Sequence, residues 1–200
     1  ITWQLMEKFS LLLDQKEVRE LFENIEMPLI HVLSKMENNG VALNAETLKE
    51  FSIELEAEID KLEKSVIEKA GEEFNVSSPK QLGIVLFENM KIDEKAKKTK
   101  TGQYSTSEET LQKLAGKHPI IDDVLEYRQL KKLKSTYVDA LPELVNKATG
   151  KIHTTYSQAV AATGRLSSVN PNLQNIPVKT EKGRKVRAAF VPSKGNELYA

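Results

Sequence analysis

One segment concentrates side chains that are suited to binding an acceptor-rich partner. Residues 163–177 read TGRLSSVNPNLQNIP and combine one arginine with several amides. Asn and Gln amides donate and accept hydrogen bonds, whereas an arginine guanidinium donates through a fixed fork. Such a surface suits phosphates, or the minor-groove edge of a nucleic-acid duplex, where every base pair presents acceptors and sequence is poorly read. The same Asn and Pro residues also build turns, so composition alone leaves a purely structural role open.

Charge is distributed unevenly along the chain, although its formal net charge is zero. Residues 1–75 carry 8 Lys or Arg against 17 Asp or Glu, and residues 76–200 carry 21 against 12. The basic part includes a lysine-rich stretch at residues 91–104, closed by Thr101-Gly102, which we expect to be an exposed, mobile loop. This asymmetry favours one part facing a polyanion, with two solvated surfaces of opposite sign as the alternative.

Signatures of catalysis are absent from the sequence. We find no Gly-rich phosphate loop, no nucleophile elbow and no His-Glu-x-x-His helix. His31, His118 and His153 have no metal-ligand spacing, so we expect no metal and no cofactor in this chain. The absence of cysteine excludes disulfides and fits a cytoplasmic origin. No apolar run approaches the length of a membrane span, and the start at Ile1 suggests an excised piece.

The elements that must position these residues are mainly helical. The apolar period over residues 1–26 predicts two helices, and Pro28 is expected in the first turn of a third. That third helix should cover residues 29–39 and end at Gly40 as its C′ residue, followed by an extended link at residues 41–43.

Two long amphipathic helices are predicted at residues 44–71 and 119–147, with Pro142 kinking the second or marking its final turns. Their apolar seams should pack antiparallel as a stalk. The expected seam residues are Leu48, Phe51, Leu55, Ile59, Leu62 and Val66 in the first helix and Leu130, Leu133, Tyr137, Leu141 and Leu144 in the second.

A small helical tip is predicted between the long helices. Ser78 begins a capping box with Pro79 at the first helical position, which predicts a helix at residues 79–89. Thr106 begins a second box, with Glu109 three residues later, which predicts a helix to about Ala115.

After Gly150 the pattern changes to short strands. Residues 151–156 alternate with β-branched residues, and residues 160–163 are the expected partner strand. Residues 167–177 should be irregular. Further strands are expected at residues 186–191 and 197–199.

The segment at residues 163–177 resembles, almost letter for letter, the signature that opens the palm of family A (polymerase I-like) DNA polymerases. Further matching blocks occur in the family's order and spacing at residues 100–109, 126–137, 152–154 and 186–191. The resemblance covers about residues 20–200. Several blocks in register make it a specific signal.

The resemblance implies that the long helix pair is the polymerase thumb, whose tip lies along the minor groove of a primer–template duplex. Arg128 and Lys132 match thumb positions near the duplex and fall four residues apart on one helix face. Lys179 matches a position that is often arginine, and lysine keeps the charge but loses the bidentate fork. The tip residues Ser77, Ser78, Lys100 and Ser105 match family positions that meet phosphates. The palm-entry residues, which match positions that contact the primer–template near the growing end, are Arg165, Ser167, Asn172, Gln174 and Asn175. The expected DNA-binding residues are therefore Ser77, Ser78, Lys100, Ser105, Arg128, Lys132, Arg165, Ser167, Asn172, Gln174, Asn175 and Lys179.

The same resemblance implies three segments: the last helices of a 3′–5′ exonuclease-like domain at residues 1–27, the thumb at residues 28–149 and the start of the palm at residues 150–200. The implied fold class is mainly α (α+β), with a long antiparallel helix pair, a helical tip and a short antiparallel β-ribbon at the palm entry. The longer enzyme would extend primers with deoxynucleoside triphosphates and would use magnesium. The aspartate of an Asp-Tyr-Ser segment, expected just beyond residue 200, would bind the magnesium. The chain itself is then expected to bind duplex DNA as a monomer, without catalytic residues of its own.

Two alternatives stay open. The amphipathic helices could pair with helices of a partner, which would make the chain a protein-interaction module. A duplex-binding chain could also belong to an RNA-handling relative, because grip on a duplex alone does not separate DNA from RNA.

Overall fold

The computed structural model describes residues 1–100 and 102–197. It is mainly helical with short antiparallel strands, which confirms the expected fold class. The chain divides into two compact units, one made of residues 45–143 and the other of residues 1–44 with the residues from 144 onward. Among the described residues, no helix combines the length and the apolar character that crossing a membrane requires.

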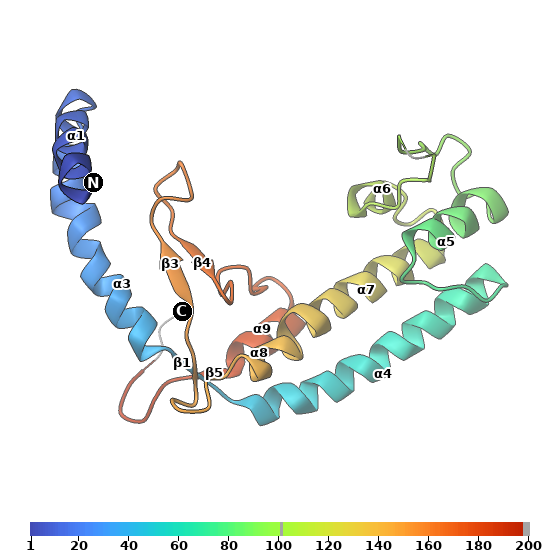
Figure 1. Cartoon of the computed structure of the whole chain (residues 1–200). Coiled ribbons are helices and arrows are strands. Elements are labelled where there is room, and N and C mark those ends of the chain that lie inside the picture. Colours follow the sequence, from blue (N-terminus) through green and yellow to red (C-terminus); the bar gives the residue numbers. More distant parts are fainter. Residues whose placement is uncertain (101, 198–200) are drawn as a thin grey trace. The chain divides into compact units, whose positions relative to one another are not determined.

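The unit of residues 45–143 is built on an antiparallel helix pair. Helix α4 (Ala45–Ala70) runs beside α7 (Pro119–Leu133), as Figure 1 shows. Helix α7 continues through a π-helical turn, η3 (Lys134–Val138), into α8 (Ala140–Glu143). The buried seam residues are Leu48, Phe51, Leu55, Ile59 and Val66 on one side and Ile120, Val124, Tyr127, Leu130, Leu133, Tyr137 and Leu141 on the other. The expected stalk is confirmed.

The second long helix ends earlier than the sequence pattern predicted. Pro142 lies in α8, the final turn, and the helix stops at Glu143 rather than at residue 147. Because proline lacks a backbone N–H and its ring clashes with the carbonyl four residues earlier, Pro142 weakens the turn in which it lies, and the helix ends one residue after it. Leu144 therefore falls outside the helix and is 47% exposed, so its assignment to the buried seam was wrong.

Polar bridges at the edge of the stalk join its two helices. Asp123 of α7 accepts hydrogen bonds from Lys69 and, at 2.7 Å, from Ser65 Oγ, both on α4. Burial raises the pKa of Asp123, but the hydrogen bonds from Lys69 and Ser65 outweigh it, so the pKa lies below its ordinary value. The ionised carboxylate is thus the form that the stalk favours.

A second bridge surrounds Lys134. Its ammonium lies 3.0 Å from a carboxylate oxygen of Glu56 on α4 and 2.8 Å from one of Asp139. Asp139 also accepts from Ser52 Oγ at 2.7 Å. Burial raises the pKa of Asp139, but the hydrogen bonds from Lys134 and Ser52 lower it by more, so the pKa lies below its ordinary value. Both bridges therefore stabilise the stalk only while these aspartates are charged.

The tip of this unit holds α5 (Pro79–Ile84), continued by the π-helical turn η2 (Val85–Asn89), and α6 (Glu108–Gln112). Ser78 caps α5 as expected, since its hydroxyl accepts from Gln81 N–H at 3.4 Å. The second capping box was misplaced by one residue. Ser107, not Thr106, caps α6 by accepting from Thr110 N–H at 3.3 Å, and α6 ends at Gln112 rather than near Ala115.

In the other unit, α1 (Thr2–Gln15) is followed by α2 (Arg19–Leu21), the π-helical turn η1 (Phe22–Glu26) and α3 (Met27–Asn39). The helical segment is continuous from α2 to α3. Glu26, the residue before α3, has helical dihedrals, and Pro28 is tolerated in the first turn of α3. Gly40 ends α3 with φ +59°, and a Cβ there would meet His153 Cε1 at 2.7 Å.

Two small antiparallel sheets complete this unit. Strand β1 (Val41–Leu43) lies between β2 (Lys151–Ile152) and β5 (Phe190–Val191). Strand β3 (Thr155–Ser157) pairs with β4 (Ser167–Val169), with Tyr156 opposite Ser168. The link expected at residues 41–43 is therefore a central strand.

One strand prediction was wrong, a second was right only at its last two residues, and a third reaches beyond the described residues. The partner of β3 is β4 rather than residues 160–163, and Val160 is 69% exposed. Residues 181–188 form helix α9 (Glu181–Ala188), because Thr180 caps it by accepting from Gly183 N–H at 3.0 Å and the segment is rich in helix-forming Lys, Arg and Ala. Only residues 190–191 of the predicted strand at 186–191 are extended. Of the strand expected at 197–199, residue 197 is not in a strand and the other two lie outside the described residues.

Candidate nucleic-acid interface

The lysine-rich stretch is organised as a hairpin, here named the basic tip (residues 91–105). Lys98 and Tyr104 form an antiparallel bridge. Ser105 N–H donates to the Lys97 carbonyl at 3.1 Å, and Thr99 N–H donates to the Gln103 carbonyl at 2.6 Å. The exposure expected of this stretch is confirmed for most of its described residues, and Thr101 lies outside the described residues. The two arms are joined by backbone hydrogen bonds.

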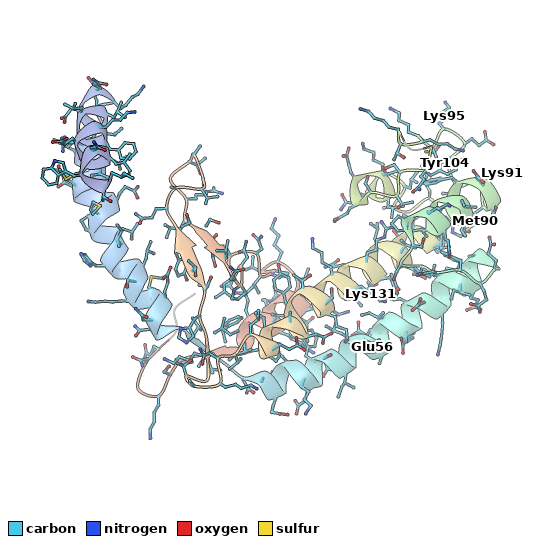
Figure 2. All side chains as sticks on the ribbon, in the orientation of Figure 1. Glu56, Met90, Lys91, Lys95, Tyr104 and Lys131 are labelled. Carbon is cyan, nitrogen blue, oxygen red and sulfur yellow. The ribbon has the colours of Figure 1, made fainter. Side chains whose placement is uncertain are left out.

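The lysines of the basic tip are all exposed, and one of them, Lys98, has close partners within the chain. Lys98 Nζ lies 4.5 Å from the centre of the Tyr104 ring and 3.5 Å from a Glu88 carboxylate oxygen. The Tyr104 ring in turn lies 5.3 Å from that of Phe87, centre to centre. Figure 2 marks Lys91, Lys95 and Tyr104 on this part of the molecule. The other exposed lysines of the tip are Lys91, Lys95, Lys97 and Lys100.

The serines expected to contact phosphates already have partners within the chain. Ser77 Oγ lies 2.8 Å from the hydroxyl of Tyr127, a side chain that is only 1% exposed. Ser78 caps α5, and Ser105 Oγ lies 3.2 Å from Thr110 Oγ1. These hydroxyls can still bind a ligand, because a hydroxyl has one donor and two acceptor sites. Their first role in the structure is to shape the tip.

Arg128 and Lys132 both lie on α7, but their surroundings differ. Lys132 is exposed. Arg128 is partly buried, and its guanidinium donates to the Thr106 carbonyl and, at 3.1 Å, to Thr106 Oγ1. Burial lowers the pKa of Arg128 from its ordinary value. The sequence pattern predicted the same role for both residues, but in the structure only Lys132 is exposed.

The second group of expected residues lies on the amide loop (residues 165–179). Gln174 Oε1 accepts from Ser168 N–H at 3.2 Å, and Gln174 Nε2 donates to the Leu166 carbonyl at 3.0 Å. Asn172 Oδ1 accepts from Gln174 N–H at 3.0 Å. Two of the amides therefore spend part of their hydrogen-bonding capacity on the loop itself. The members of this group that are exposed are Arg165, Asn172, Gln174, Asn175 and Lys179, and Ser167 is half-buried in β4.

A buried hydroxyl pair underlies the amide loop, and the sequence reading missed it. Thr154 Oγ1 lies 2.7 Å from Ser168 Oγ, 3.0 Å from the Val169 carbonyl and 2.7 Å from the Pro171 carbonyl. Ser168 is fully buried, and its Oγ accepts from Leu173 N–H at 3.2 Å. The sequence did contain a signal for the burial of Thr154, because two-residue alternation places it on the same inward side as Ile152.

The twelve expected residues divide evenly between the two units. Ser77, Ser78, Lys100, Ser105, Arg128 and Lys132 belong to the unit of residues 45–143, and the remaining six belong to the other. Within the first group, Lys100 and Ser105 both belong to the basic tip, and Arg128 donates a hydrogen bond to Thr106, the residue after Ser105.

Two of the histidines have hydrogen-bond partners within the chain. His118 Nδ1 accepts from Ile120 N–H at 3.2 Å at the start of α7. His153 lies between the Glu37 carbonyl and the Thr149 hydroxyl, each at 2.7 Å. No group of three or more His, Asp or Glu residues that could hold a metal ion occurs within residues 1–100 and 102–197.

Residues 45–200 match the sequence pattern of DNA polymerase family A. The chain belongs to this family. It is 52% identical over 195 residues to DNA polymerase I of Synechocystis sp., covering 96% of this chain, and 50% identical over 194 residues to DNA polymerase I of Bacillus subtilis, covering 97%. It spans 20% and 22% of these two proteins, so about a fifth of their length.

A solved structure resembles the fold closely. The POL domain of Pol1 from M. smegmatis, in complex with a DNA primer-template and dNTP, matches 92% of this chain with a TM-score of 0.82 and 40% sequence identity. The chain corresponds to 32% of that structure. The stalk, tip and strands described above thus form part of a polymerase domain.

Proposed function

We propose that this chain is the part of a DNA-directed DNA polymerase that holds the primer–template duplex. The observation that carries the proposal is the match between its fold and a polymerase domain that was solved with primer-template DNA. The exposed lysines of the basic tip supply positive charge where the family resemblance expects phosphates.

The assignment of segments follows from the family resemblance. Residues 28–149 would be the thumb, residues 1–27 the end of an exonuclease-like domain, and residues 150–200 the start of the palm. The compact unit of residues 45–143 lies entirely within the proposed thumb, which supports that part of the assignment.

The two groups of residues would contribute differently to binding. Lysines such as Lys100 and Lys132 would neutralise phosphates without reading sequence. Arg165 and the spare amide donors of the amide loop would meet minor-groove acceptors, which occur at every base pair. The chain should therefore bind duplexes of unrelated sequence equally well.

The longer protein would carry out the chemistry, adding deoxynucleotides to a primer as the family name implies. Magnesium is the metal expected for that step, and the carboxylates found within residues 1–100 and 102–197 do not form a set that fits it. We therefore expect this chain not to extend primers alone. A gel assay with a labelled primer–template and deoxynucleoside triphosphates tests this, and extension by the purified chain would contradict it.

Binding itself is tested by titrating the chain into two fluorescent DNA duplexes of unrelated sequence and one RNA–DNA hybrid. We expect dissociation constants within about threefold of each other for the two DNA duplexes, since phosphate contacts carry most non-specific affinity. A strong preference for one sequence would contradict the proposal. A preference for the hybrid would favour the RNA-handling alternative.

Arg165→Ala provides a local test of the amide loop. The substitution should weaken binding to a primer–template junction more than binding to a blunt duplex, because the family resemblance puts this residue near the growing end of the primer. Lys100→Ala is the matched control on the basic tip and should weaken both substrates alike. An equal effect of Arg165→Ala on both substrates would contradict its minor-groove role.

One observation favours the alternative that the chain is a protein-interaction module. Helices α1 to α3 expose many large apolar side chains, among them Trp3, Phe9, Leu11, Ile25 and Val32. Where such side chains form a contiguous patch, the patch marks an interaction site. Sedimentation tests the alternative, since a stable dimer without affinity for DNA would favour it over duplex binding.

A further inference from the structure

Arg128 is a partly buried cation that is bound by neutral groups. Within residues 1–100 and 102–197, no carboxylate lies within ion-pair distance of its guanidinium. One terminal nitrogen donates to the Thr106 carbonyl and the other donates to Thr106 Oγ1 at 3.1 Å. Arginine thus uses its planar fork on a single residue, in the way it usually binds a carboxylate or a phosphate.

Thr106 is held from two sides. It is only 6% exposed, with Arg128 of α7 on one side. On the other side lies Gly83 of α5, where an added Cβ would approach Tyr104 Cβ to 3.1 Å and Thr106 Cγ2 to 3.5 Å. The segment of residues 104–106 is therefore fixed between two helices.

This segment is also the returning arm of the basic tip. Tyr104 pairs with Lys98, and Ser105 N–H donates to the Lys97 carbonyl at 3.1 Å. On the other side of Thr106, Ser107 caps α6. Whatever fixes Thr106 therefore fixes both the hairpin that carries the lysines and the start of the next helix.

We propose that Arg128 is a positioning residue that fastens the basic tip to α7 through Thr106, and that it does not itself neutralise a DNA phosphate. The proposal rests on the duplex-binding function proposed above and assigns a mechanism to one of its residues. Without Arg128, the buried Thr106 carbonyl and hydroxyl lose their donor, and buried acceptors without partners destabilise the local fold. The tip would then have to become ordered on binding, which weakens affinity without changing the number of phosphate contacts.

Amide hydrogen exchange tests the fastening without any DNA. Arg128→Ala should lower the protection of the Ser105 amide roughly 10-fold, as expected for a lost buried hydrogen-bond partner. Lys132→Ala, four residues away on the same helix and exposed, is the matched control and should leave that protection unchanged. Unchanged protection in Arg128→Ala would overturn the proposal.

Thr106→Val keeps the volume of the side chain and removes only the Oγ1 acceptor. It should lower protection by less than Arg128→Ala, and the double variant should lose less than the combined effects of the single variants, because both remove the same interaction. Fully additive effects would contradict the link. Thr106→Val also carries the test if circular dichroism shows that Arg128→Ala has unfolded the unit.

The salt dependence of duplex binding separates fastening from charge. Arg128→Ala should weaken affinity roughly 5- to 30-fold at every salt concentration with the slope of log affinity against log salt unchanged. Lys132→Ala should flatten that slope by about one. A slope that flattens by about one in Arg128→Ala, with unaltered binding in Thr106→Val, would assign Arg128 to a phosphate instead. If the unaltered chain binds no duplex, the proposed function fails, and the exchange comparison still decides the role of Arg128.

Discussion

The basic tip and the amide loop are expected to contact the same kind of partner, yet they are built in opposite ways. The tip presents exposed lysines such as Lys91 and Lys100 on a hairpin whose shape comes from backbone bonds and from Thr106. In the amide loop, Gln174 and Asn172 bind the backbone of the loop itself. Apart from Lys98, which contacts Tyr104 and Glu88, the tip separates the side chains available for a ligand from the groups that give shape. In the loop, Gln174 and Asn172 are available for a ligand and also give shape.

This difference predicts different responses to substitution. Loss of one exposed lysine removes a charge and little structure, because long surface side chains add little to stability. Loss of an amide from the loop removes a ligand contact and a loop contact together. Effects on binding and on stability should thus be separable in the tip and coupled in the loop.

The largest expected effect comes from the stalk that carries the tip. Leu55→Ala removes a fully buried side chain from α4 and should lower the free energy of unfolding by about 2–5 kcal/mol, through lost burial and the cavity left behind. Urea denaturation measures it. Ile53→Ala on the same helix is the control, since Ile53 is 70% exposed and should change stability by less than about 0.5 kcal/mol. Equal losses would contradict the seam as described.

The next effect concerns the shape of the amide loop. Thr154→Val keeps the side-chain volume but removes the buried hydroxyl that contacts Ser168 Oγ and the carbonyls of Val169 and Pro171, and the loss of these hydrogen bonds should cost about 1–3 kcal/mol. Faster amide exchange at Leu173 and Gln174 would report it. Thr155→Val, one residue on and exposed, is the control. If the two variants behave alike, the buried hydroxyl pair does not hold the loop.

A smaller effect is the acid sensitivity of the stalk. Because the pKa of Asp123 is lowered in the folded chain, its contribution to stability is present above the unfolded pKa of about 3.9 and is lost as pH falls through the folded value. The free energy of unfolding should therefore decline below about pH 4, and Asp123→Asn should flatten that decline. Asp60→Asn, at an exposed site on α4, is the control and should leave the decline intact. An unchanged acid decline in Asp123→Asn would remove this bridge from the account.

The smallest expected effect is that of a single lysine on affinity. Lys100→Ala should weaken duplex binding by about 1 kcal/mol or less at moderate salt, equally for all sequences, and should leave the melting temperature unchanged. Gln174→Ala should affect both binding and the exchange protection of Ser168. A fall in melting temperature with Lys100→Ala would mean that charge and shape are not separated in the tip.

Much of the helical part of the fold could be predicted from the sequence. The seam of α4 repeats at spacings of three and four, and a period over so many residues leaves little ambiguity. Ser78 followed by Pro79 predicted the start of α5 correctly, because cap and proline give the same signal. These features are local, and local sequence was sufficient.

The strands and the side-chain roles could not be predicted as well. Two- and three-residue strands such as β2 and β4 carry too few alternations to identify, and the partner of β2 is far away in sequence. Arg128 looked like a free surface cation because the sequence does not show that Thr106 folds back against it. Whether a polar side chain binds a ligand or its own backbone depends on contacts that only the fold brings together.

The central claim is that this chain binds duplex DNA through contacts with the DNA phosphates. It is tested most directly by measuring the affinity of the chain for a blunt DNA duplex between about 50 and 200 mM salt. If four to six phosphates are neutralised, log affinity should fall with log salt at a slope of about −4 to −5. A binding affinity that does not change with salt would contradict the claim.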